Sequence, residues 1–296
     1  MHILVTGGTG FIGRALVPAL VACGHDVTVL SRSMRGVENG VVYCQALSEV
    51  SLDIDAVINL AGASLAERRW TARYKREIVA SRVQLTQKLV AWLTQLQSPP
   101  RVLISGSAVG FYGHDSRAVF TEENGRGRGF SADLCADWEQ AAEAALGVIP
   151  QVLLLRLGVV FDRGGGALQE MLRSFQFGLQ SWLGTGEQWL SWIHRADVVS
   201  AICHLLDHPS ASGAFNLTAP EPVTHRAFSE AAARHLPTRL SAGVPKAVMR
   251  LLVGEMADEL LLNGQKVLPD RLVKAGFTFN HPNIDSALQS ILSDDR

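Results

Sequence analysis

The stretch ILVTGGTGFIGRAL, residues 3–16, decides the fold. An apolar run enters a glycine-rich turn, and helix-like sequence follows. Gly7, Gly10 and Gly13 give the spacing GxxGxxG, and Gly8 with the last two also satisfies GxGxxG. Such glycines permit a tight turn out of a strand, a close approach of backbone N–H groups to a diphosphate, and close packing of the helix on the sheet. Because a strand precedes the motif and a helix follows it, we predict a dinucleotide-binding βαβ unit rather than an ordinary glycine-rich turn.

Short β-rich runs alternate with longer helical runs over the first two thirds of the chain. We expect strands in HILVTG, HDVTVLSR, DAVINLAG, RVLISGSA and VLLLRLGVVF, with a shorter one around VVYCQAL. Helices are expected in GRALVPALVACG, over residues 71–97 and in SADLCADWEQAAEAAL. This alternation is typical of an α/β fold with a doubly wound parallel sheet of the Rossmann type.

The rhythm changes after Phe161, and the stretch from about Pro222 onward is mostly helical in pattern. We therefore predict a small, mainly helical C-terminal lobe beside the sheet domain. Residues 1–165 and 192–221 are assigned to the cofactor-binding domain. Residues 166–191 and 222–296 are assigned to the smaller lobe, which would meet a substrate or a partner.

Composition narrows the classes of function. The 296 residues carry a formal net charge of −1, so binding to nucleic acid or to an anionic membrane surface is not expected. The four cysteines lie far apart, with no CxxC spacing, so neither a metal site nor a disulfide framework is expected. No apolar stretch reaches the ~18–20 residues that span a bilayer. A strand-like run from residue 2 argues against a secretory signal, and we predict a cytoplasmic protein.

The end of the second expected strand, in DVTVLSRSMR, indicates which dinucleotide binds. NAD-binding proteins place an acidic residue here, on the ribose 2′-hydroxyl. This chain has Ser31 instead, followed by Arg32, with Arg35 nearby. A serine and an arginine suit a 2′-phosphate. We predict NADP(H), against the alternative that both arginines are solvated loop charges.

Several motifs together carry a family resemblance. TGGTGFIG, INLAG at 58–62, ISGSAVGFYG at 104–113 and AFNLT at 214–218 resemble the extended and atypical short-chain dehydrogenases/reductases. More narrowly, ERRWTARYKREIVASR, LCADWE, LRLGVVFDRGGGAL, SWIHRADVV and KVLPDRLVKAGFTF resemble the NADP-binding "epimerase family protein" group, which is nucleotide-sugar epimerase-like. The resemblance spans residue 1 to about residue 288. It implies an NADP(H)-binding Rossmann domain and a small C-terminal lobe that shapes a substrate pocket.

The motifs and the resemblance together define the expected cofactor contacts. They are Gly7, Thr9, Gly10, Phe11, Ile12, Gly13, Ser31, Arg32, Arg35, Leu60, Ala61, Gly62 and Arg82. Arg82 falls at or beside the place where relatives have an asparagine near the active site. It is therefore a candidate either for the cofactor phosphate or for an anionic substrate. The alternative is a helix-surface arginine paired with a carboxylate.

Catalysis in short-chain reductases needs a serine or threonine that orients the substrate oxygen, a tyrosine that transfers a proton, and a lysine four residues later. Ser107, in SGSAVGFYG, aligns with the family's serine, and Ser105 is the second choice.

The tyrosine and lysine are missing. The helix GFSADLCADWEQ places Ser131 and Cys135 at these positions, or Phe130 and Leu134 in a register shifted by one. Tyr112, which follows the serine-bearing strand, is the candidate for a substitute acid. Without the pair, hydride transfer between an alcohol and a ketone loses its usual proton donor.

Two functions follow from these residues. The first is an NADP(H)-dependent oxidoreductase or epimerase-like enzyme acting on a small polar carbonyl or sugar-derived compound. Ser107 would orient this substrate, and Tyr112, a water or the substrate itself would supply the proton. The second is a non-catalytic NADP(H) sensor or binding module, which the missing pair favours. Either function is compatible with a homodimer.

Overall fold

The computed structural model describes residues 1–33 and 36–293. Within these residues, eight strands form one sheet, in the order β13-β8-β6-β5-β1-β2-β4-β3. Every neighbouring pair is parallel except β3 with β4. The strands are β1 (His2–Thr6), β2 (Asp26–Leu30), β3 (Gly36–Glu38), β4 (Val41–Cys44), β5 (Ala56–Asn59), β6 (Val102–Ala108), β8 (Gln151–Leu157) and β13 (Gly213–Leu217).

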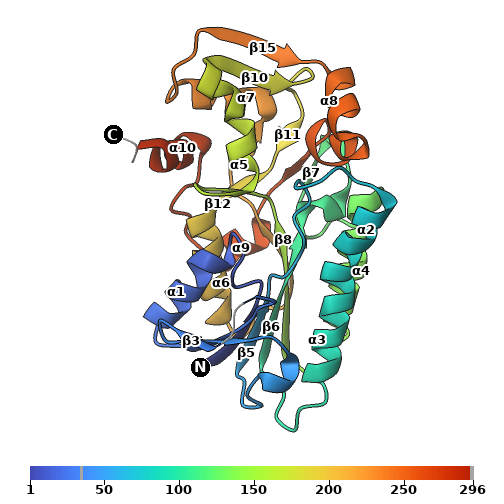
Figure 1. The fold of residues 1–296 in the computed structure, drawn as a ribbon, viewed down its shortest axis with the longest axis vertical. Coiled ribbons are helices and arrows are strands. Elements are labelled where there is room, and N and C mark those ends of the chain that lie inside the picture. Colours follow the sequence, from blue (N-terminus) through green and yellow to red (C-terminus); the bar gives the residue numbers. More distant parts are fainter. Residues whose placement is uncertain (34–35, 294–296) are drawn as a thin grey trace.

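Helices cover both faces of this sheet (Figure 1). One face carries α1 (Gly13–Ala22), α6 (Arg195–Leu206) and α9 (Asp270–Lys274), which contribute Leu16, Ile202 and Leu272 to a shared core. The other face carries α3 (Leu85–Leu93) and α4 (Phe130–Glu143), which pack against alternate residues of the same strands. The predicted doubly wound Rossmann-type sheet is therefore confirmed.

The chain order of the strands positions the site. From β1 the chain passes outward through β2 and β4. It then crosses back to the other side of β1 and continues through β5, β6 and β8. The direction of winding thus reverses between β1 and β5. In open α/β sheets, ligands bind outside the carboxyl ends of the strands at such a reversal.

The long helix expected over residues 71–97 is present, with a π-helical segment inside it. α2 (Ala72–Val79) runs into the π-helical segment Ala80–Gln84 and then into α3. Thr71 caps the start of α2 by accepting a hydrogen bond from the Tyr74 N–H. Segments of this kind insert one residue per turn and change which side chains face the neighbouring elements.

One expected strand is two strands in the structure, which corrects the sequence prediction for VLLLRLGVVF. β8 ends at Leu157, and β9 (Val159–Phe161) leaves the sheet to pair with β12 (Trp192–His194). Gly158 separates the two strands, and a Cβ atom there would lie 2.7 Å from the Ser191 carbonyl oxygen. The break carries the chain from the central sheet into the upper lobe.

The upper lobe in Figure 1 combines helices with short strand pairs. In its core, Phe161 stacks on Trp192 with ring centroids 5.7 Å apart and packs at a tilt against Phe228 at 5.4 Å. The domain boundaries given above stay a prediction. The elements of this region are α5 (Gly166–Met171), β10 (Leu179–Leu183), β11 (Trp189–Leu190), β14 (Val223–Thr224), α7 (His225–Ala233), β15 (Leu240–Val244), α8 (Lys246–Val253) and α10 (Ile284–Leu292).

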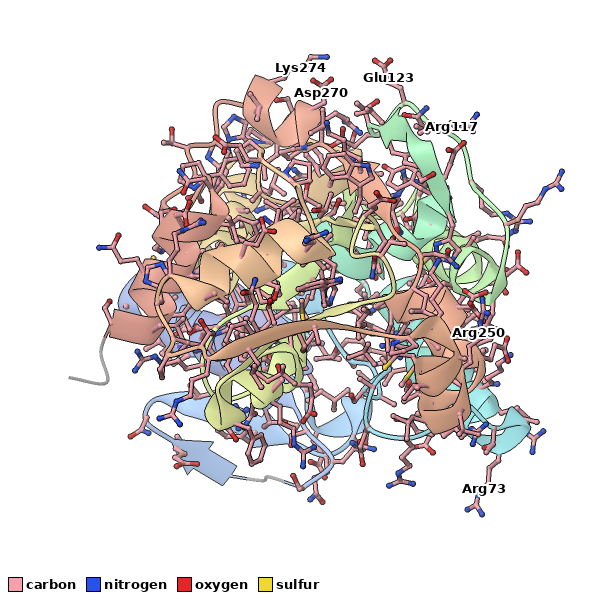
Figure 2. The ribbon with its side chains drawn as sticks, turned by 90° about the horizontal axis from the view of Figure 1, so that it is seen from above. Arg73, Arg117, Glu123, Arg250, Asp270 and Lys274 are labelled. Atoms are coloured by element: carbon pink, nitrogen blue, oxygen red, sulfur yellow. The ribbon has the colours of Figure 1, made fainter. Side chains whose placement is uncertain are left out.

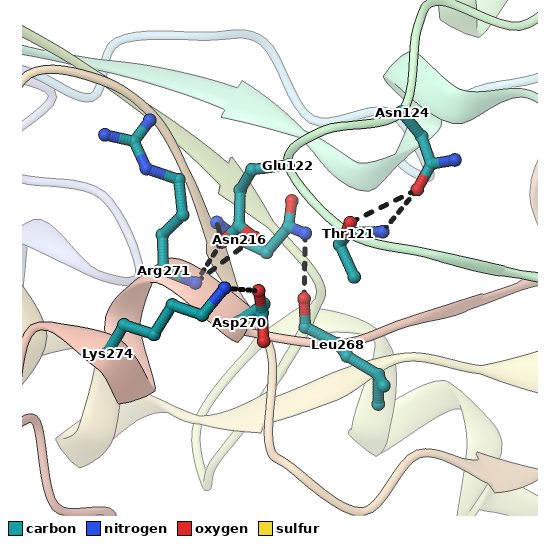
Figure 3. A network of polar contacts seen from close by, with 8 residues as sticks. All are labelled: Thr121, Glu122, Asn124, Asn216, Leu268, Asp270, Arg271 and Lys274. Atoms are coloured by element: carbon teal, nitrogen blue, oxygen red, sulfur yellow. Dashed lines mark hydrogen bonds and ion pairs between the residues drawn. The ribbon is translucent and has the colours of Figure 1, made fainter.

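The segment KVLPDRL, residues 266–272, connects this lobe with the central sheet, and Figure 3 shows the polar contacts around it. β16 (Gln265–Val267) pairs with β7 (Asp115–Phe120), and α9 packs on β13. The Glu122 carboxylate accepts hydrogen bonds from the backbone N–H groups of Asn216, at 2.9 Å, and Arg271, at 3.3 Å. The Asn216 side-chain amide donates to the Leu268 carbonyl at 2.9 Å. These bonds fasten the segment across β13 and the start of α9.

Two negative findings concern the described part of the chain. None of its helices is both long enough and apolar enough to cross a membrane. Nowhere in residues 1–33 and 36–293 do three or more His, Cys, Asp or Glu side chains gather as a metal ion would require. Within the same residues, Cys23, Cys44, Cys135 and Cys203 form no disulfide.

Acid sensitivity follows from His225 in α7. Burial lowers its pKa to about 4, and its Nδ1 atom has no hydrogen-bond partner among the described residues. The ordinary pKa of histidine in an unfolded chain is about 6.5. Because the folded state binds this proton more weakly, the stability that depends on a neutral His225 is present above pH 6.5 and decreases as the pH falls toward 4.

We predict that His225→Leu reduces the loss of folding stability at acid pH. Between pH 7.5 and 5.5 the variant should lose about 1.3 kcal/mol less free energy of unfolding than the wild type. Urea denaturation at the two pH values measures the difference. His235→Leu, at an exposed histidine beyond the same helix, should keep the wild-type dependence. Equal losses in His225→Leu and the wild type would contradict the prediction.

Candidate functional site

A cavity of ≈310 Å³ lies at the carboxyl ends of β1 and β5, where the winding reverses. It combines the glycine turn, the residues after β5 and the segment that leads into the upper lobe. Seven of the expected cofactor residues therefore line this cavity. The lining is Gly7, Gly10, Phe11, Ile12, Gly13, Leu60, Gly62, Val159, Val160, Gly166 and Ala167.

Glycine is required at the three positions of the turn for different physical reasons. Gly7 has φ +72°, and a Cβ atom there would lie 2.6 Å from the backbone of Leu60. A Cβ atom on Gly13 would lie 2.3 Å from the Gly7 carbonyl oxygen. By contrast, a Cβ atom on Gly10 would approach only that same oxygen, at 3.1 Å, so its other side is open space. The backbone at Gly10 thus leaves room for a diphosphate before the N-terminus of α1, and the residues present fit a dinucleotide.

A buried polar chain holds the turn in register with the next strand. The Thr6 hydroxyl donates to Asn59 Oδ1 at 2.6 Å and accepts from the Ala61 N–H. The Asn59 amide donates to Thr86 and to the Ser105 hydroxyl, at 2.8 and 3.1 Å. Ser105, the second choice for the catalytic serine, is therefore part of this chain, which links β1, β5, β6 and α3.

Two residues that the sequence did not single out clamp Phe11. Arg195, at the start of α6, forms an ion pair with Asp162, with Nε 2.7 Å from the carboxylate oxygen. Arg195 also donates to the Phe11 carbonyl at 3.2 Å, and its guanidinium lies 4.8 Å from the ring centroid. Gly165 and Gly166 back onto the same ring, since Cβ atoms there would lie 2.9 Å from it. The motifs DRGGGAL and IHRADV contain these residues. Their role becomes visible only in the structure, where both motifs contact Phe11.

The expected phosphate-binding residues lie at the end of β2. Ser31 is buried, and its N–H donates to the Cys44 carbonyl at 2.8 Å. Arg32 follows it and is exposed. Thr9, in the glycine turn, is also exposed. Arg35 lies outside the described residues. Positions 31–33 carry no carboxylate that would repel a 2′-phosphate.

Ser107 and Tyr112 belong to one buried network. The Ser107 hydroxyl donates to Glu139 Oε1 at 2.6 Å. Arg156 grips the same carboxylate with two bonds of 2.8 Å and donates to the Tyr112 hydroxyl at 2.9 Å. The Tyr112 hydroxyl in turn donates to Asn216 Oδ1 at 2.7 Å. The network joins β6, α4, β8 and β13.

This placement bears on the two catalytic candidates. Tyr112 is 2% exposed, stacks on Phe120 with centroids 5.2 Å apart, and has its pKa raised by burial. Its proton is already donated to Asn216, so the geometry argues against Tyr112 as the acid that reaches a ligand. Ser107 lies at the carboxyl end of β6, and its role stays a prediction.

Arg82 is not the exposed, carboxylate-paired helix arginine that was one of the alternatives. It lies in the π-helical segment and is mostly buried, and burial lowers its pKa. Its Nη2 donates to the Ala63 carbonyl at 2.9 Å, and its guanidinium lies 5.3 Å from the Trp138 ring centroid. A Cβ atom on Gly62 would lie 3.0 Å from its Cζ atom. Among the described residues, no carboxylate forms an ion pair with it.

The face of α4 that should carry the tyrosine and lysine has a different chemistry. The hydroxyl of Ser131 is buried and has no hydrogen-bond partner within the described chain. Burial raises the pKa of the Cys135 thiol to about 12, so this thiol stays protonated. Both side chains face Gly110, since a Cβ atom there would lie 3.2 and 3.7 Å from them. Neither a phenol nor an amine is present on this face.

A doubly wound sheet, a glycine turn before a helix and a cavity at the winding reversal define a Rossmann-type dinucleotide-binding protein. Residues 3–218 match the NAD dependent epimerase/dehydratase family. Residues 244–291 match a domain of unknown function, DUF1731. The chain belongs to the NAD dependent epimerase/dehydratase family, which confirms the epimerase-like resemblance.

Relatives match over nearly the whole chain. An epimerase family protein of Mycobacterium bovis is 38% identical over 294 residues, which cover 97% of this chain and 96% of that protein. The Arabidopsis thaliana "Epimerase family protein SDR39U1 homolog, chloroplastic" is 38% identical over 305 residues, covering 99% and 87%. The crystal structure of human epimerase family protein SDR39U1 (isoform 2) with NADPH is 34% identical, with a TM-score of 0.92 and coverage of 99% and 100%.

We predict that Glu139→Gln destabilises the fold strongly. The substitution leaves Arg156 as a buried cation without its counter-ion, which costs roughly 3–5 kcal/mol in free energy of unfolding. Guanidinium denaturation measures the loss. Glu170→Gln, which breaks an exposed ion pair with Arg173, should change stability by less than about 0.5 kcal/mol. Similar small effects of both substitutions would show that the buried pair does not hold the four elements together.

Proposed function

We propose that this chain is an NADP(H)-dependent oxidoreductase or epimerase-like enzyme that acts on a small polar carbonyl or sugar-derived compound. The observation that carries the proposal is the composition of the cavity wall. The glycine turn supplies one side, and residues 159–167, which lead into the upper lobe, supply another. A ligand beyond the cofactor would therefore contact both parts of the molecule, as a substrate held against a nicotinamide must.

The choice of NADP(H) rests on two supports. The human relative with 34% identity was crystallised with NADPH. In this chain, Ser31 and Arg32 follow β2 where a 2′-phosphate would lie, the backbone at Gly10 would hold the diphosphate, and Leu60–Gly62 would line the path to the nicotinamide. When bound, NADP(H) supplies hydride transfer, and the chain's own residues orient the substrate and exclude water.

Proton transfer is the step for which the chain lacks the usual residues. Ser107 would orient a substrate hydroxyl by accepting its hydrogen bond, because the Ser107 proton is itself donated to Glu139. Because Tyr112 is buried with its proton donated to Asn216, we favour a water or a hydroxyl of the substrate as the proton source. Transfer between two groups of one substrate, as in an epimerisation, needs no net proton from the protein.

The alternative is a non-catalytic NADP(H) sensor. A specific observation favours it, since Ser131 and Cys135 replace the proton donor and its lysine partner. A sensor would retain the cofactor cavity without turnover. A cytoplasmic location and a homodimer stay predictions under both functions.

We predict that Arg32→Ala weakens NADPH binding about 10–100-fold, because a charge-assisted contact to the 2′-phosphate is lost. NADH binding should change less than about 2-fold, since NADH lacks this phosphate. Fluorescence titration with each cofactor measures both constants. Arg117→Ala, at an exposed arginine on β7 (Figure 2), serves as the control for loss of a surface charge. Equal weakening of both cofactors in Arg32→Ala, or a wild-type preference for NADH, would refute the assignment.

The enzyme proposal is tested by turnover. NADPH-loaded protein is mixed with a deproteinised small-molecule extract of its own cells, and the absorbance of the reduced nicotinamide is followed beside heat-inactivated protein. We expect protein-dependent oxidation, reduced at least about 10-fold in Ser107→Ala because the substrate oxygen is no longer oriented. NADPH affinity should be unchanged in that variant.

A flat trace from wild-type protein that binds NADPH tightly favours the sensor, provided that two further assays are also negative. One starts from NADP⁺, and the other follows epimerisation of sugar nucleotides by chromatographic separation of the epimers, because hydride returned from the cofactor does not exchange with solvent. Full turnover in Ser107→Ala would support the enzyme proposal but would show that Ser107 has no catalytic role in it.

A further inference from the structure

Arg82 is a partly buried cation that has no counter-ion among the described residues. Burial disfavours its charged form, and within the described residues no carboxylate pairs with it. The other interior arginine of this region, Arg156, has the Glu139 carboxylate as its partner. Burying an unpaired charge is costly, so such a group is retained where something outside the chain balances it.

The position of Arg82 separates it from the places where the phosphates of the cofactor are expected, and this favours a partner other than the cofactor. Arg82 lies against Gly62 after β5 and against Trp138 on α4, which packs on β6. The site for a 2′-phosphate is at the end of β2, on the other side of β1. The diphosphate site is at the N-terminus of α1, where backbone N–H groups are available. Arg82 therefore lies on the side of the reversal where the nicotinamide and a substrate would meet.

Arg82 also has donors to spare. A guanidinium carries five N–H donors. One donates to the Ala63 carbonyl, and a second makes a long 3.5 Å contact with the Ser81 hydroxyl. The side chain keeps some exposure, so its remaining donors are not sealed from a ligand.

A second, independent observation lies on the facing helix. The Ser131 hydroxyl is a buried donor without a partner in the described chain. Ser131 and Cys135 are one turn apart on α4, both face Gly110, and Cys135 lies near Arg82. An unpaired hydroxyl and an unbalanced guanidinium on the same side of α4 are both donors, which anionic oxygens would accept.

The N-terminus of α4 is not itself the anion site. Its first N–H groups, at Phe130 and Ser131, already donate to the Glu259 carboxylate, at 3.3 and 3.1 Å. An anion would meet Arg82 deeper along the helix, toward Trp138.

We propose that Arg82, assisted by Ser131, binds an anionic group of the substrate, a carboxylate or a phosphate. This inference rests on the proposed function, because it assigns the substrate of that same site to the acidic compounds. The planar fork of arginine suits both groups, which are the common anions of small metabolites.

The test is calorimetric titration of NADPH-loaded protein with malonate and, separately, with inorganic phosphate at constant ionic strength. Saturation with NADPH fills the cofactor's own phosphate sites first. We expect at least one anion to bind with a millimolar dissociation constant. Arg82→Met should weaken it at least about 10-fold, Arg82→Lys less, and Ser131→Ala about 3-fold or more.

Arg73→Met is the matched control, because Arg73 is exposed on α2 of the same long helix and points outward (Figure 2). It should bind both anions within about 2-fold of the wild type. NADPH affinity is measured in every variant, and its retention in Arg82→Met shows that a lost anion signal is not a loss of fold. If Arg82→Met does not fold, Arg82→Lys and Ser131→Ala decide the question.

Binding of malonate alone indicates a carboxylate substrate, and binding of phosphate alone indicates a phosphorylated one. Wild-type protein that binds neither anion, or variants at Arg82 that bind them as tightly as the wild type, would overturn the proposal. The assay needs no turnover, so its failure is separate from failure of the enzyme proposal. Anion binding without turnover in the extract assay would support the subsite and count against the enzyme.

Discussion

The site depends on how closely the start of α1 approaches the end of β1. A single Cβ atom on Gly13 would lie 2.3 Å from the Gly7 carbonyl oxygen, and one on Gly7 would meet the backbone after β5. Only glycine at both places lets the helix N-terminus face the cavity at the winding reversal. The Thr6–Asn59 hydrogen bond then holds the neighbouring strand end beside the turn. The cavity wall, and with it the cofactor's path, follows from these two contacts.

A second constraint is the demand that buried polar groups find partners. The Glu139–Arg156 pair meets that demand for Ser107 and Tyr112 and ties four elements of the sheet domain together. This pair explains why Ser107 and Tyr112, both catalytic candidates in the sequence, belong to one buried polar network. It also makes the exceptions informative. Arg82 has no counter-ion and Ser131 no side-chain partner within the described residues, and Arg82 lies against Gly62 of the cavity wall.

Much of the fold could be predicted, since the signals are local. The apolar strands, the helix in GRALVPALVACG and the glycine turn each depend on residues within one short segment. The split of VLLLRLGVVF could not be predicted, because β9 leaves the sheet to pair with β12, about thirty residues away. The clamp on Phe11 was missed for the same reason, since Arg195 is distant in sequence.

The sequence by itself determined the Rossmann sheet, the glycine turn and the absence of the Tyr-x-x-x-Lys pair, because each is written in adjacent residues with a regular spacing. The tertiary structure alone decided what the candidate side chains do. It buried the Tyr112 hydroxyl against Asn216 and turned Arg82 inward through the π-helical segment. The physical reason is that burial and charge pairing depend on partners contributed by distant strands and helices, and only folding brings these together.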